Sequence, residues 1–342
     1  MFEQYPPIAG TEIVAETVNL SPLLGKTVAI IGYGTMGRAH ALNLVRSGVE
    51  VVVGSRKGSE KGQKAVQEGL TNLTVAEAVG RADVVMLMLP DEAMAAVYQA
   101  EVESHLKPNA ALGFAHGFAI AFDQIHPATG RPCFLAAPKG QGDMLLQAHA
   151  AGGGVPGLLA VTDDSPQETW ELAAAYTKAV GSLTGGGFVT TFRAECISDQ
   201  FGEQVVLCGG VIELLKSAFD IMVEAGYGAE NAYFECVHEL KLITDLLHRH
   251  GVDGMRDMIS GTASYGGLTR GPRVIDDGVR ARMKDILQEL EDGRFAGELL
   301  ARHGETAALA AAEADGPLAT TGRAMLPRLH PETDKNGNPK GR

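Results

Sequence analysis

Cysteine, long apolar runs and excess positive charge are all scarce in this sequence. It contains four cysteines and no C-x-x-C pair, so we expect reduced thiols in a cytoplasmic protein rather than a disulfide framework. No stretch approaches the ~18 apolar residues of a membrane span. The first twenty residues carry acids and lack the apolar core of a secretory signal. The net charge of −13 argues against a general nucleic-acid or anionic-membrane surface, so we expect neither as a partner.

Glycine and apolar residues are what the chain does contain in quantity, with 43 glycines and 45% hydrophobic residues. The length of 342 residues is enough for two domains with sizeable cores. In the first half, short apolar runs alternate with stretches of helical spacing. We predict strands there at 26–31, 49–54, 82–90, 111–116, 133–137 and 157–162. This alternation is typical of a doubly wound parallel sheet covered by helices on both faces.

The pattern changes after residue 185, where long segments of helical spacing follow one another with few turn signals. The sequence therefore predicts an α/β protein in which a Rossmann-type domain, residues 1–185, precedes an all-helical domain, residues 186–329. The remaining residues, 330–342, are polar and contain Gly and Pro, so we expect a disordered tail.

A glycine fingerprint lies between the first predicted strand and the first predicted helix. Gly32, Gly34 and Gly37 form G-x-G-x-x-G directly after the apolar run KTVAII. Such glycines permit a tight turn and let a pyrophosphate approach the backbone N–H groups at the helix start. The sequence thus predicts a dinucleotide site, with an ordinary glycine turn of an α/β protein as the alternative.

The loop after the second predicted strand indicates which dinucleotide binds. NAD-binding domains usually place Asp or Glu there to hold the ribose 2′-hydroxyl, whereas this loop reads GSRKGSEKG. Its cations and hydroxyls suit a 2′-phosphate and are Ser55, Arg56, Lys57, Ser59 and Lys61. We therefore predict NADPH as the cofactor, although Glu60 lies in the same loop. A solvated basic loop is the alternative.

Two pairs of carboxylates stand out in the helical half, each with four-residue spacing. Asp199 and Glu203 form one pair, Glu235 and Glu239 form the other, and apolar neighbours indicate that both helices are buried. Buried carboxylates are costly unless they are paired or bind metal, and four of them suit hard cations such as Mg²⁺. Two solvated acidic faces are the alternative. A di-iron centre is disfavoured because the first pair lacks the second E-x-x-H that such bundles use.

Together these motifs resemble those of the ketol-acid reductoisomerase (acetohydroxyacid isomeroreductase) family in its short, class I form. The resemblance extends from about residue 20 to residue 329. It includes AIIGYGTMGRAHALNL, FAHGF, APKG, FGEQVVLCGGVIELL, AYFECVHELKLITDLL and MISGTASYG, in that order. It implies a knotted helical domain, NADPH with two Mg²⁺ ions, and active sites shared between intertwined subunits.

The resemblance also implies roles for individual residues. The implied metal ligands are Asp199, Glu203, Glu235 and Glu239, and the implied substrate-binding residues are Glu195 and Ser260. The implied catalytic residues are His116, Lys139 and Glu239. The implied cofactor-binding residues are Gly32, Tyr33, Gly34, Thr35, Met36, Gly37, Ser55, Arg56, Ser59, Lys61, Leu89, Pro90, His116 and Gly142.

Three segments depart from the pattern of this family. After the APKG motif the family commonly reads P-G-H, whereas this chain has Gln141, Gly142 and Asp143. The glycine turn carries Met36 and Arg38 where many relatives have Gln and His. The segment before FGEQ usually reads like ETETDL, but here it is ECISDQ. We expect these departures to alter the lining around substrate and cofactor.

The implied reaction has two steps on 2-acetolactate or 2-aceto-2-hydroxybutyrate. Mg²⁺-dependent alkyl migration comes first, and NADPH then reduces the product to the 2,3-dihydroxy acid, as in valine and isoleucine biosynthesis. The expected partners are this small-molecule substrate and further copies of the chain, at least an intertwined dimer and up to a dodecamer. The alternatives are a β-hydroxyacid or 6-phosphogluconate-type dehydrogenase, which needs no divalent cation, and a reductoisomerase-like protein with an altered substrate.

Overall fold

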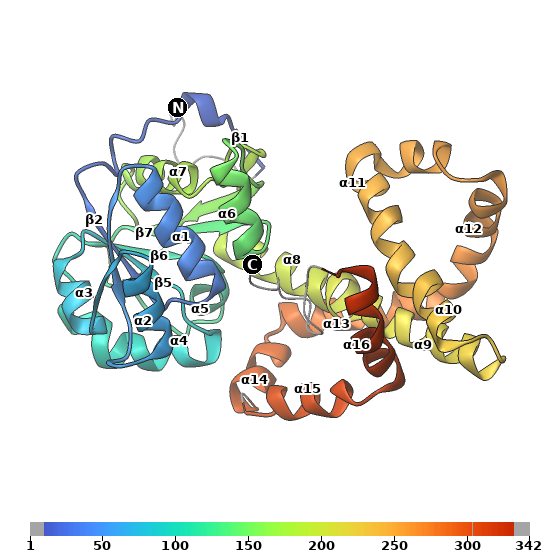
Figure 1. Ribbon diagram of the computed structural model, residues 1–342. Helices are drawn as coiled ribbons and strands as arrows, with labels where there is room; N and C mark the ends of the chain where they lie inside the picture. The colour runs from blue at the N-terminus through green and yellow to red at the C-terminus, as the bar shows by residue number, and fades with distance from the viewer. Residues whose placement is uncertain (1–9, 303, 332–342) are drawn as a thin grey trace. The chain divides into compact units, whose positions relative to one another are not determined.

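The computed structural model describes residues 10–302 and 304–331. Contacts divide the chain into two compact units, with the boundary between Ser198 and Asp199. The first unit contains a sheet flanked by helices, and the described part of the second contains helices alone (Figure 1). The expected disordered tail, residues 330–342, lies outside the described residues from position 332 onward.

Nine strands form one sheet in the described part of the first unit. They are β1 (Glu12–Ile13), β2 (Thr27–Ile31), β3 (Glu50–Gly54), β4 (Thr71–Leu73), β5 (Val84–Leu87), β6 (Ala111–Phe114), β7 (Cys133–Pro138), β8 (Gly157–Val161) and β9 (Gly187–Val189). Their order is β1-β9-β8-β7-β6-β5-β2-β3-β4. Strands β2 to β7 pair in parallel. Their arrangement follows the 3-2-1-4-5-6 order of Rossmann-type sheets, as the sequence predicts.

The sheet as a whole is mixed, because the strands beyond β7 at one edge include antiparallel pairs. β8 runs antiparallel to β7, with Phe134 opposite Val161, and β1 runs antiparallel to β9. The cause lies in the connection after β7. Lys139 N–H donates to the carbonyl oxygen of Pro156 at 2.7 Å, so the chain re-enters the sheet at the end where it left. A parallel strand would require a crossover to the opposite end.

Eight α-helices begin within the described part of the first unit, and helices cover both faces of the sheet (Figure 1). They are α1 (Thr35–Arg46), α2 (Glu60–Gln67), α3 (Val75–Arg81), α4 (Asp91–Val97), α5 (Phe118–Ala121), α6 (Gly142–Ala150), α7 (Thr169–Ala179) and α8 (Phe192–Gly202). Successive strand residues point to opposite faces. Val28 and Ile30 therefore join one buried cluster with α1, α2 and α7, while Ala29 and Ile31 join a second with α3, α4 and α5.

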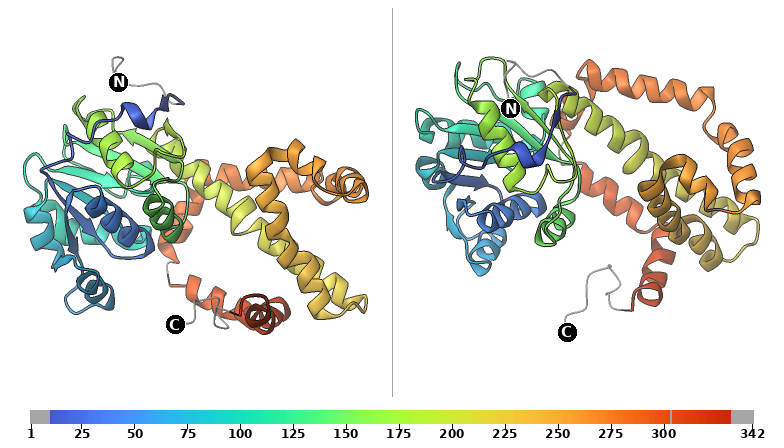
Figure 2. Two further views of the ribbon diagram at one scale, coloured as in Figure 1. Left: turned by 45° about the horizontal axis from the view of Figure 1, so that its top comes forward. Right: turned by 90° about the horizontal axis from the view of Figure 1, so that it is seen from above.

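The described part of the second unit contains further helices (Figure 2). They are α9 (Gly210–Glu224), α10 (Ala229–Tyr233), α11 (Glu239–Asp257), α12 (Gly261–Val274), α13 (Asp277–Glu291), α14 (Arg294–Ala301), α15 (Thr306–Ala314) and α16 (Pro317–Leu329). Helix α11 is kinked at Gly251, where φ is +69°. The buried cluster of this unit is small and comprises Phe219, Ala232, Tyr233 and Met325.

The helices that carry the acidic pairs are exposed in the single chain, so the prediction that they are buried is wrong for it. Glu203, Glu235 and Glu239 are all exposed. The apolar neighbour Phe234 is also 39% exposed. The physical reason is that one chain supplies only a small apolar cluster to this unit, which leaves most of the apolar helix faces uncovered.

The cysteines are free thiols, as the sequence predicts. Cys133 and Cys196 are buried, and Cys208 is exposed. Among residues 10–302 and 304–331, no helix combines the length and the apolar character needed to cross a membrane.

Candidate active site

The glycine turn after β2 allows backbone segments to approach one another closely. Gly32 has φ +99°, and a Cβ there would lie 2.5 Å from the carbonyl oxygen of Met88. A Cβ on Gly37 would lie 2.3 Å from the carbonyl oxygen of Gly32. Gly34 is the N-cap of α1 and adds no side chain. The first N–H groups of α1 therefore face an open turn, an arrangement that binds pyrophosphate in other proteins.

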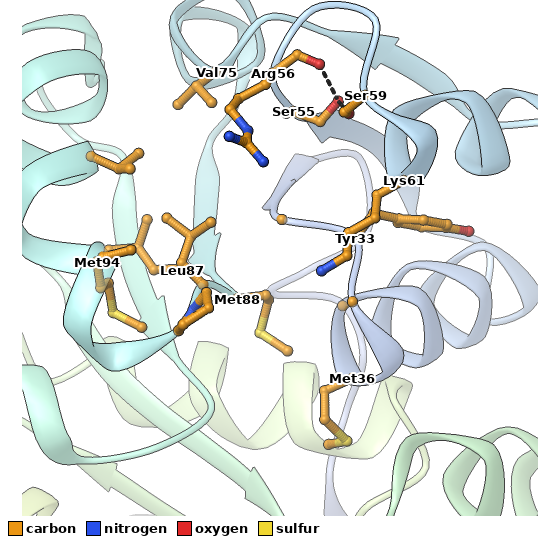
Figure 3. A pocket seen from close by; sticks show the side chains of 18 of the residues that line it. Tyr33, Met36, Ser55, Arg56, Ser59, Lys61, Val75, Leu87, Met88 and Met94 are labelled. Atoms are coloured by element: carbon orange, nitrogen blue, oxygen red, sulfur yellow. Dashed lines mark hydrogen bonds between the residues drawn. The ribbon is translucent and has the colours of Figure 1, made fainter. Parts of the chain in front are cut away.

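A cavity of about 970 Å³ lies where the chain leaves β2, β3 and β5 (Figure 3). Its wall contains the predicted cofactor-binding residues except Gly142, and of the loop cations it lacks Lys57. Gly142 begins α6 and packs behind the turn, since a Cβ there would lie 2.4 Å from the carbonyl oxygen of Thr35. The carboxyl ends of parallel strands are the usual ligand site of such sheets. The structure thus brings the glycine turn, the loop after β3 and the segment 89–90 around one space.

The cavity wall contains two basic side chains, Arg56 and Lys61 (Figure 3). Neither side chain makes a hydrogen bond or ion pair with another described residue. The Lys61 ammonium lies 4.0 Å from the point where a Gly34 Cβ would be. Two unpaired cations beside an open helix N-terminus suit a phosphate group.

The serines of the same loop already use their hydroxyl groups within the protein. The Ser55 hydroxyl donates to Asn72 Oδ1 at 2.9 Å, and the Ser59 hydroxyl donates to Ser55 Oγ at 3.2 Å. Ser59 also caps α2, because its Oγ accepts from the N–H of Gly62. Both serines therefore hold the loop in shape. The two cations remain as the side-chain donors that can reach a phosphate.

A second polar cluster adjoins the cavity and surrounds the carboxylate of Glu195. This side chain is only 1% exposed. Lys139 Nζ donates to its Oε1 at 2.7 Å, and the N–H of Gly117 donates to its Oε2 at 2.8 Å. His116 Nδ1 lies 3.2 Å from the same Oε2. Because His116 also lines the cavity, the structure brings three predicted site residues together beside the predicted cofactor site.

The contacts in this cluster fix its charge. Burial alone would raise the pKa of Glu195, but its contacts with His116 and Lys139 hold that pKa below the usual value. Burial alone would lower the pKa of His116, yet its contacts with Cys196 and Glu195 raise it to about 11. At neutral pH the Glu195 anion therefore lies between two cations, and the Asp91 carboxylate lies 3.9 Å from His116 Nε2 on the other side of the ring. The Lys139 ammonium and the His116 ring are the groups of this cluster that can attract an anionic oxygen.

Helix α8 reaches this cluster because Gly117 has no side chain. A Cβ on Gly117 would lie 2.1 Å from the carbonyl oxygen of Phe192. The close approach also places Cys196 Sγ 3.8 Å from His116 Nε2. Cys196 lies in the segment ECISDQ, which departs from the family pattern. This departure therefore contacts a predicted catalytic residue, His116. This thiol is buried, and burial raises its pKa.

Each predicted acidic pair of the helical half coincides with a π-helical turn. One turn, Glu203–Leu207, begins at an acid of the first pair, and the other, Phe234–His238, spans the interval between Glu235 and Glu239. π-Helical turns are rare and occur frequently at functional sites. Within the described residues, the four carboxylates do not gather with ligand atoms inside 4.8 Å of one another. Their assignment as metal ligands stays a prediction, as does the catalytic role of Glu239.

Ser260, predicted to bind the substrate, is the N-cap of α12. Its Oγ accepts from the N–H of Ala263 at 3.1 Å. This bond uses the oxygen as an acceptor, so the hydroxyl proton can still be donated to a ligand.

The cavity wall also contains residues that the sequence does not single out. Met94, Val97 and Glu101 line it, together with Val75 and Asp91. The spacing of three and four residues places the first three on one face of the helical segment that starts at Asp91. The available sequence signal for Asp91 is its place just after a strand and Pro90, because strand ends carry ligand-binding residues in these sheets.

Two family models match the chain. One is described as "Acetohydroxy acid isomeroreductase, NADPH-binding domain" and matches residues 22–186. The other is described as "Ketol-acid reductoisomerase, C-terminal domain" and matches residues 192–327. The first range contains the glycine turn and the cavity, and the second contains Glu195 and both acidic pairs.

Solved structures resemble this chain at two levels of similarity. An NADH-preferring ketol-acid reductoisomerase from an uncultured archean is 39% identical with a TM-score of 0.89, covering 93% of this chain and 99% of that chain. A semialdehyde dehydrogenase NAD-binding protein from Cupriavidus necator, solved with calcium and NAD, is 20% identical with a TM-score of 0.57. That match covers 79% of this chain and 99% of that chain, and it shows a shared fold alone.

Proposed function

Because the chain belongs to the ketol-acid reductoisomerase family, we propose that it converts 2-acetolactate and 2-aceto-2-hydroxybutyrate into 2,3-dihydroxy acids. As a member of this family it is an oxidoreductase with a nicotinamide cofactor. In the first proposed step, an alkyl group migrates from the carbinol carbon to the adjacent ketone carbon. In the second, hydride from the cofactor reduces the new 2-keto group, as valine and isoleucine biosynthesis requires.

One observation supports this proposal most directly. The dinucleotide cavity and the polar cluster around Glu195 share His116, so two cations that can hold a keto acid, His116 and Lys139, lie beside the space for the cofactor. Reduction of a carbonyl needs fixed positive groups where negative charge develops on oxygen. Lys139 Nζ and the His116 ring supply such charge, and both contact the buried Glu195 carboxylate.

The residues present fit the groups that this reaction uses. Bound NADPH supplies the hydride, and bound Mg²⁺ supplies Lewis acidity at the hydroxyl and ketone oxygens. The open glycine turn with the unpaired Arg56 and Lys61 fits a dinucleotide with a 2′-phosphate. The carboxylate oxygens of Asp199, Glu203, Glu235 and Glu239 are the donor type that Mg²⁺ prefers. In the proposed reaction Lys139 would hold an anionic oxygen of the substrate, and His116 would keep a proton on Nε2 at the cavity wall.

For the cofactor, we assign the 2′-phosphate of NADPH to Arg56 and Lys61. Two observations point toward NADH instead. The similar archean enzyme is described as NADH-preferring, and Glu60 in the same cavity wall is the type of residue that favours a ribose hydroxyl.

The assignment of Arg56 to the 2′-phosphate can be tested by mutation. Arg56→Ala should raise the KM for NADPH by about tenfold, because a charge-assisted hydrogen bond is lost, and change the KM for NADH little. Lys57→Ala is the matched control, since Lys57 is not part of the wall. Equal weakening of both cofactors would remove Arg56 from phosphate recognition.

The metal assignment has its own test. Asp199→Asn should abolish isomerisation while NADPH binding persists, because the variant loses an anionic oxygen ligand of the predicted pair. Product formation measures the first property, and nicotinamide fluorescence measures the second. Glu230→Gln removes an exposed acid of α10 outside both pairs and serves as the control. Isomerisation by Asp199→Asn at the wild-type rate would show that the ligand assignment is wrong.

We also propose that the protein is at least a dimer, joined through the second unit. Large apolar side chains remain exposed there in the single chain, among them Leu207 at 65%, Ile221 at 65% and Leu309 at 70%. Extensive exposed apolar surface marks interaction sites on soluble proteins. Light scattering should give a mass of at least twice 35.9 kDa. A single-chain mass over a range of protein concentrations would contradict this proposal.

The decisive experiment follows NADPH oxidation with 2-acetolactate, 2-aceto-2-hydroxybutyrate and 3-hydroxypyruvate, with and without Mg²⁺. We expect turnover of the first two compounds that disappears when a chelator removes the metal. Full activity after chelation would favour a β-hydroxyacid-type dehydrogenase instead. Binding of NADPH without turnover of any compound would favour a related protein with an altered substrate.

A further inference from the structure

Two of the departures from the family pattern meet in space. Arg38 lies on α1 directly after the glycine turn, and Asp143 lies in the first turn of α6. Arg38 Nη1 is 3.5 Å from Asp143 Oδ1. The two departures therefore form an ion pair against the helix that begins at the cofactor turn. Asp143 is 71% exposed, so this pair contributes little by itself.

Arg38 has a closer and less exposed partner in Glu68. Arg38 Nε donates to Glu68 Oε1 at 2.7 Å and to Oε2 at 3.0 Å, and Arg38 Nη2 lies 2.6 Å from Oε1. The Tyr33 hydroxyl donates to Glu68 Oε2 at 2.6 Å. Burial alone would raise the pKa of Glu68, but the hydrogen bonds from Arg38 and Tyr33 hold it below its usual value. The carboxylate is therefore ionised and holds both donors at neutral pH.

These contacts connect two segments that form the cofactor cavity. Tyr33 stands between Gly32 and Gly34 in the turn, is 3% exposed, and directs its ring away from the cavity (Figure 3). Glu68 is the C-cap of α2, and Lys61 lies at the other end of that helix. Because α2 is a short continuous helix, a bond that fixes Glu68 also fixes where the backbone of Lys61 lies, and the Lys61 ammonium is 4.0 Å from the point where a Gly34 Cβ would be.

We propose that Glu68 and Arg38 are positioning residues that hold the glycine turn and α2 in the arrangement needed for cofactor binding. Neither residue lines the cavity, so both act through Tyr33 and Lys61. The inference rests on the binding of a nicotinamide cofactor in the proposed function, and it is independent of which keto acid is reduced. It assigns the departure at Arg38 to cofactor affinity and not to substrate choice.

The test compares Glu68→Ala with Glu68→Gln in the full-length protein. Titration of nicotinamide fluorescence gives the Kd for NADPH, and steady-state oxidation gives kcat and the KM for each substrate. Glu68→Ala should raise the Kd and KM for NADPH by about tenfold. The loss for NADH should be smaller, because Lys61 faces the 2′-phosphate. The kcat and the KM for 2-acetolactate should change less than about twofold. Glu68→Gln keeps an acceptor for Tyr33 and should recover most of the affinity.

The matched control is Lys107→Ala. Lys107 pairs with Asp83 at 2.9 Å in the same unit and outside the cavity wall, so its loss should lower Tm and leave the Kd for NADPH unchanged. If Glu68→Ala does not fold, Tyr33→Phe removes one hydrogen bond of the same network and should raise that Kd by about threefold.

Two results would overturn the inference. One is a Glu68→Ala protein with a reduced Tm and the wild-type Kd for NADPH, which would make the network an ordinary structural ion pair. The other is an equal loss of affinity for NADPH and for the keto acid. The Kd titration needs no turnover, so a protein that binds NADPH and reduces no ketol acid would contradict the proposed reaction and still decide the role of Glu68.

Discussion

Acid should destabilise the first unit through one buried histidine. His40 on α1 and Tyr176 on α7 are fully buried, and His40 Nδ1 lies 2.9 Å from the Tyr176 hydroxyl. Burial lowers the pKa of His40 from 6.5 to about 3. The folded protein keeps the ring neutral, whereas the unfolded chain takes up a proton below pH 6.5. The stability that this group contributes is therefore complete above pH 6.5 and is lost as the pH falls toward 3.

The size of the effect follows from these two pKa values. At pH 5 the unfolded chain carries nearly one proton on His40 that the folded chain does not, which lowers the free energy of unfolding by about 2 kcal/mol relative to pH 7. Small domains are typically stable by only ~5–15 kcal/mol, so the loss is large. His40→Asn should lack this pH dependence, whatever it costs at pH 7, because asparagine does not titrate.

Urea unfolding followed by the fluorescence of Trp170 measures this effect. Trp170 is the one tryptophan of the chain, lies on α7 and is 4% exposed. The change in unfolding free energy between pH 7 and pH 5 should be about 2 kcal/mol smaller in His40→Asn than in the wild type. His105→Asn, which alters an exposed histidine, should behave as the wild type does. The same pH dependence in all three proteins would refute the reasoning.

Three further predictions concern the backbone of the first unit. Asp123 has φ +51°, so Asp123→Gly should raise the unfolding free energy in urea by ~0.5–1 kcal/mol, and Asp123→Ala should not. Gly117→Ala should lower both stability and turnover, because the added methyl meets the Phe192 carbonyl oxygen; wild-type values for both would contradict this close packing. Ser59→Ala should cost about 1 kcal/mol through loss of the bond from Gly62, and an unchanged urea midpoint would argue against that cap.

The parallel core of the sheet is readable from sequence because its strands are buried on both faces. The apolar runs at 26–31 and 157–162 coincide with β2 and β8 to within a residue. β4 gives no such signal, because its three residues, Thr71–Leu73, form no apolar run. The direction of β8 depends on where the connection after Pro138 returns, which no local pattern records.

The candidate site also has parts that the sequence predicts and parts that it does not. The glycine turn and the loop after β3 are short continuous segments that act through backbone geometry and local charge, so sequence alone locates them. The contacts that join Arg38, Glu68 and Asp143 connect distant segments, and no spacing in the chain links them. The exposure of the acidic helices is unpredictable for a related reason. An apolar stripe indicates that a helix face is covered, but not which chain covers it.

The π-helical turn Phe234–His238 means that the chain contains one residue more there than an α-helix along the same path would need. Deleting one residue from this turn would restore the α-helical hydrogen-bond pattern and leave the later turns of α11 facing as before. A deletion elsewhere in α11 would rotate every later side chain by ~100° about the helix axis. Chain length at this turn can therefore vary by one residue while the change falls mainly on the spacing of Glu235 and Glu239.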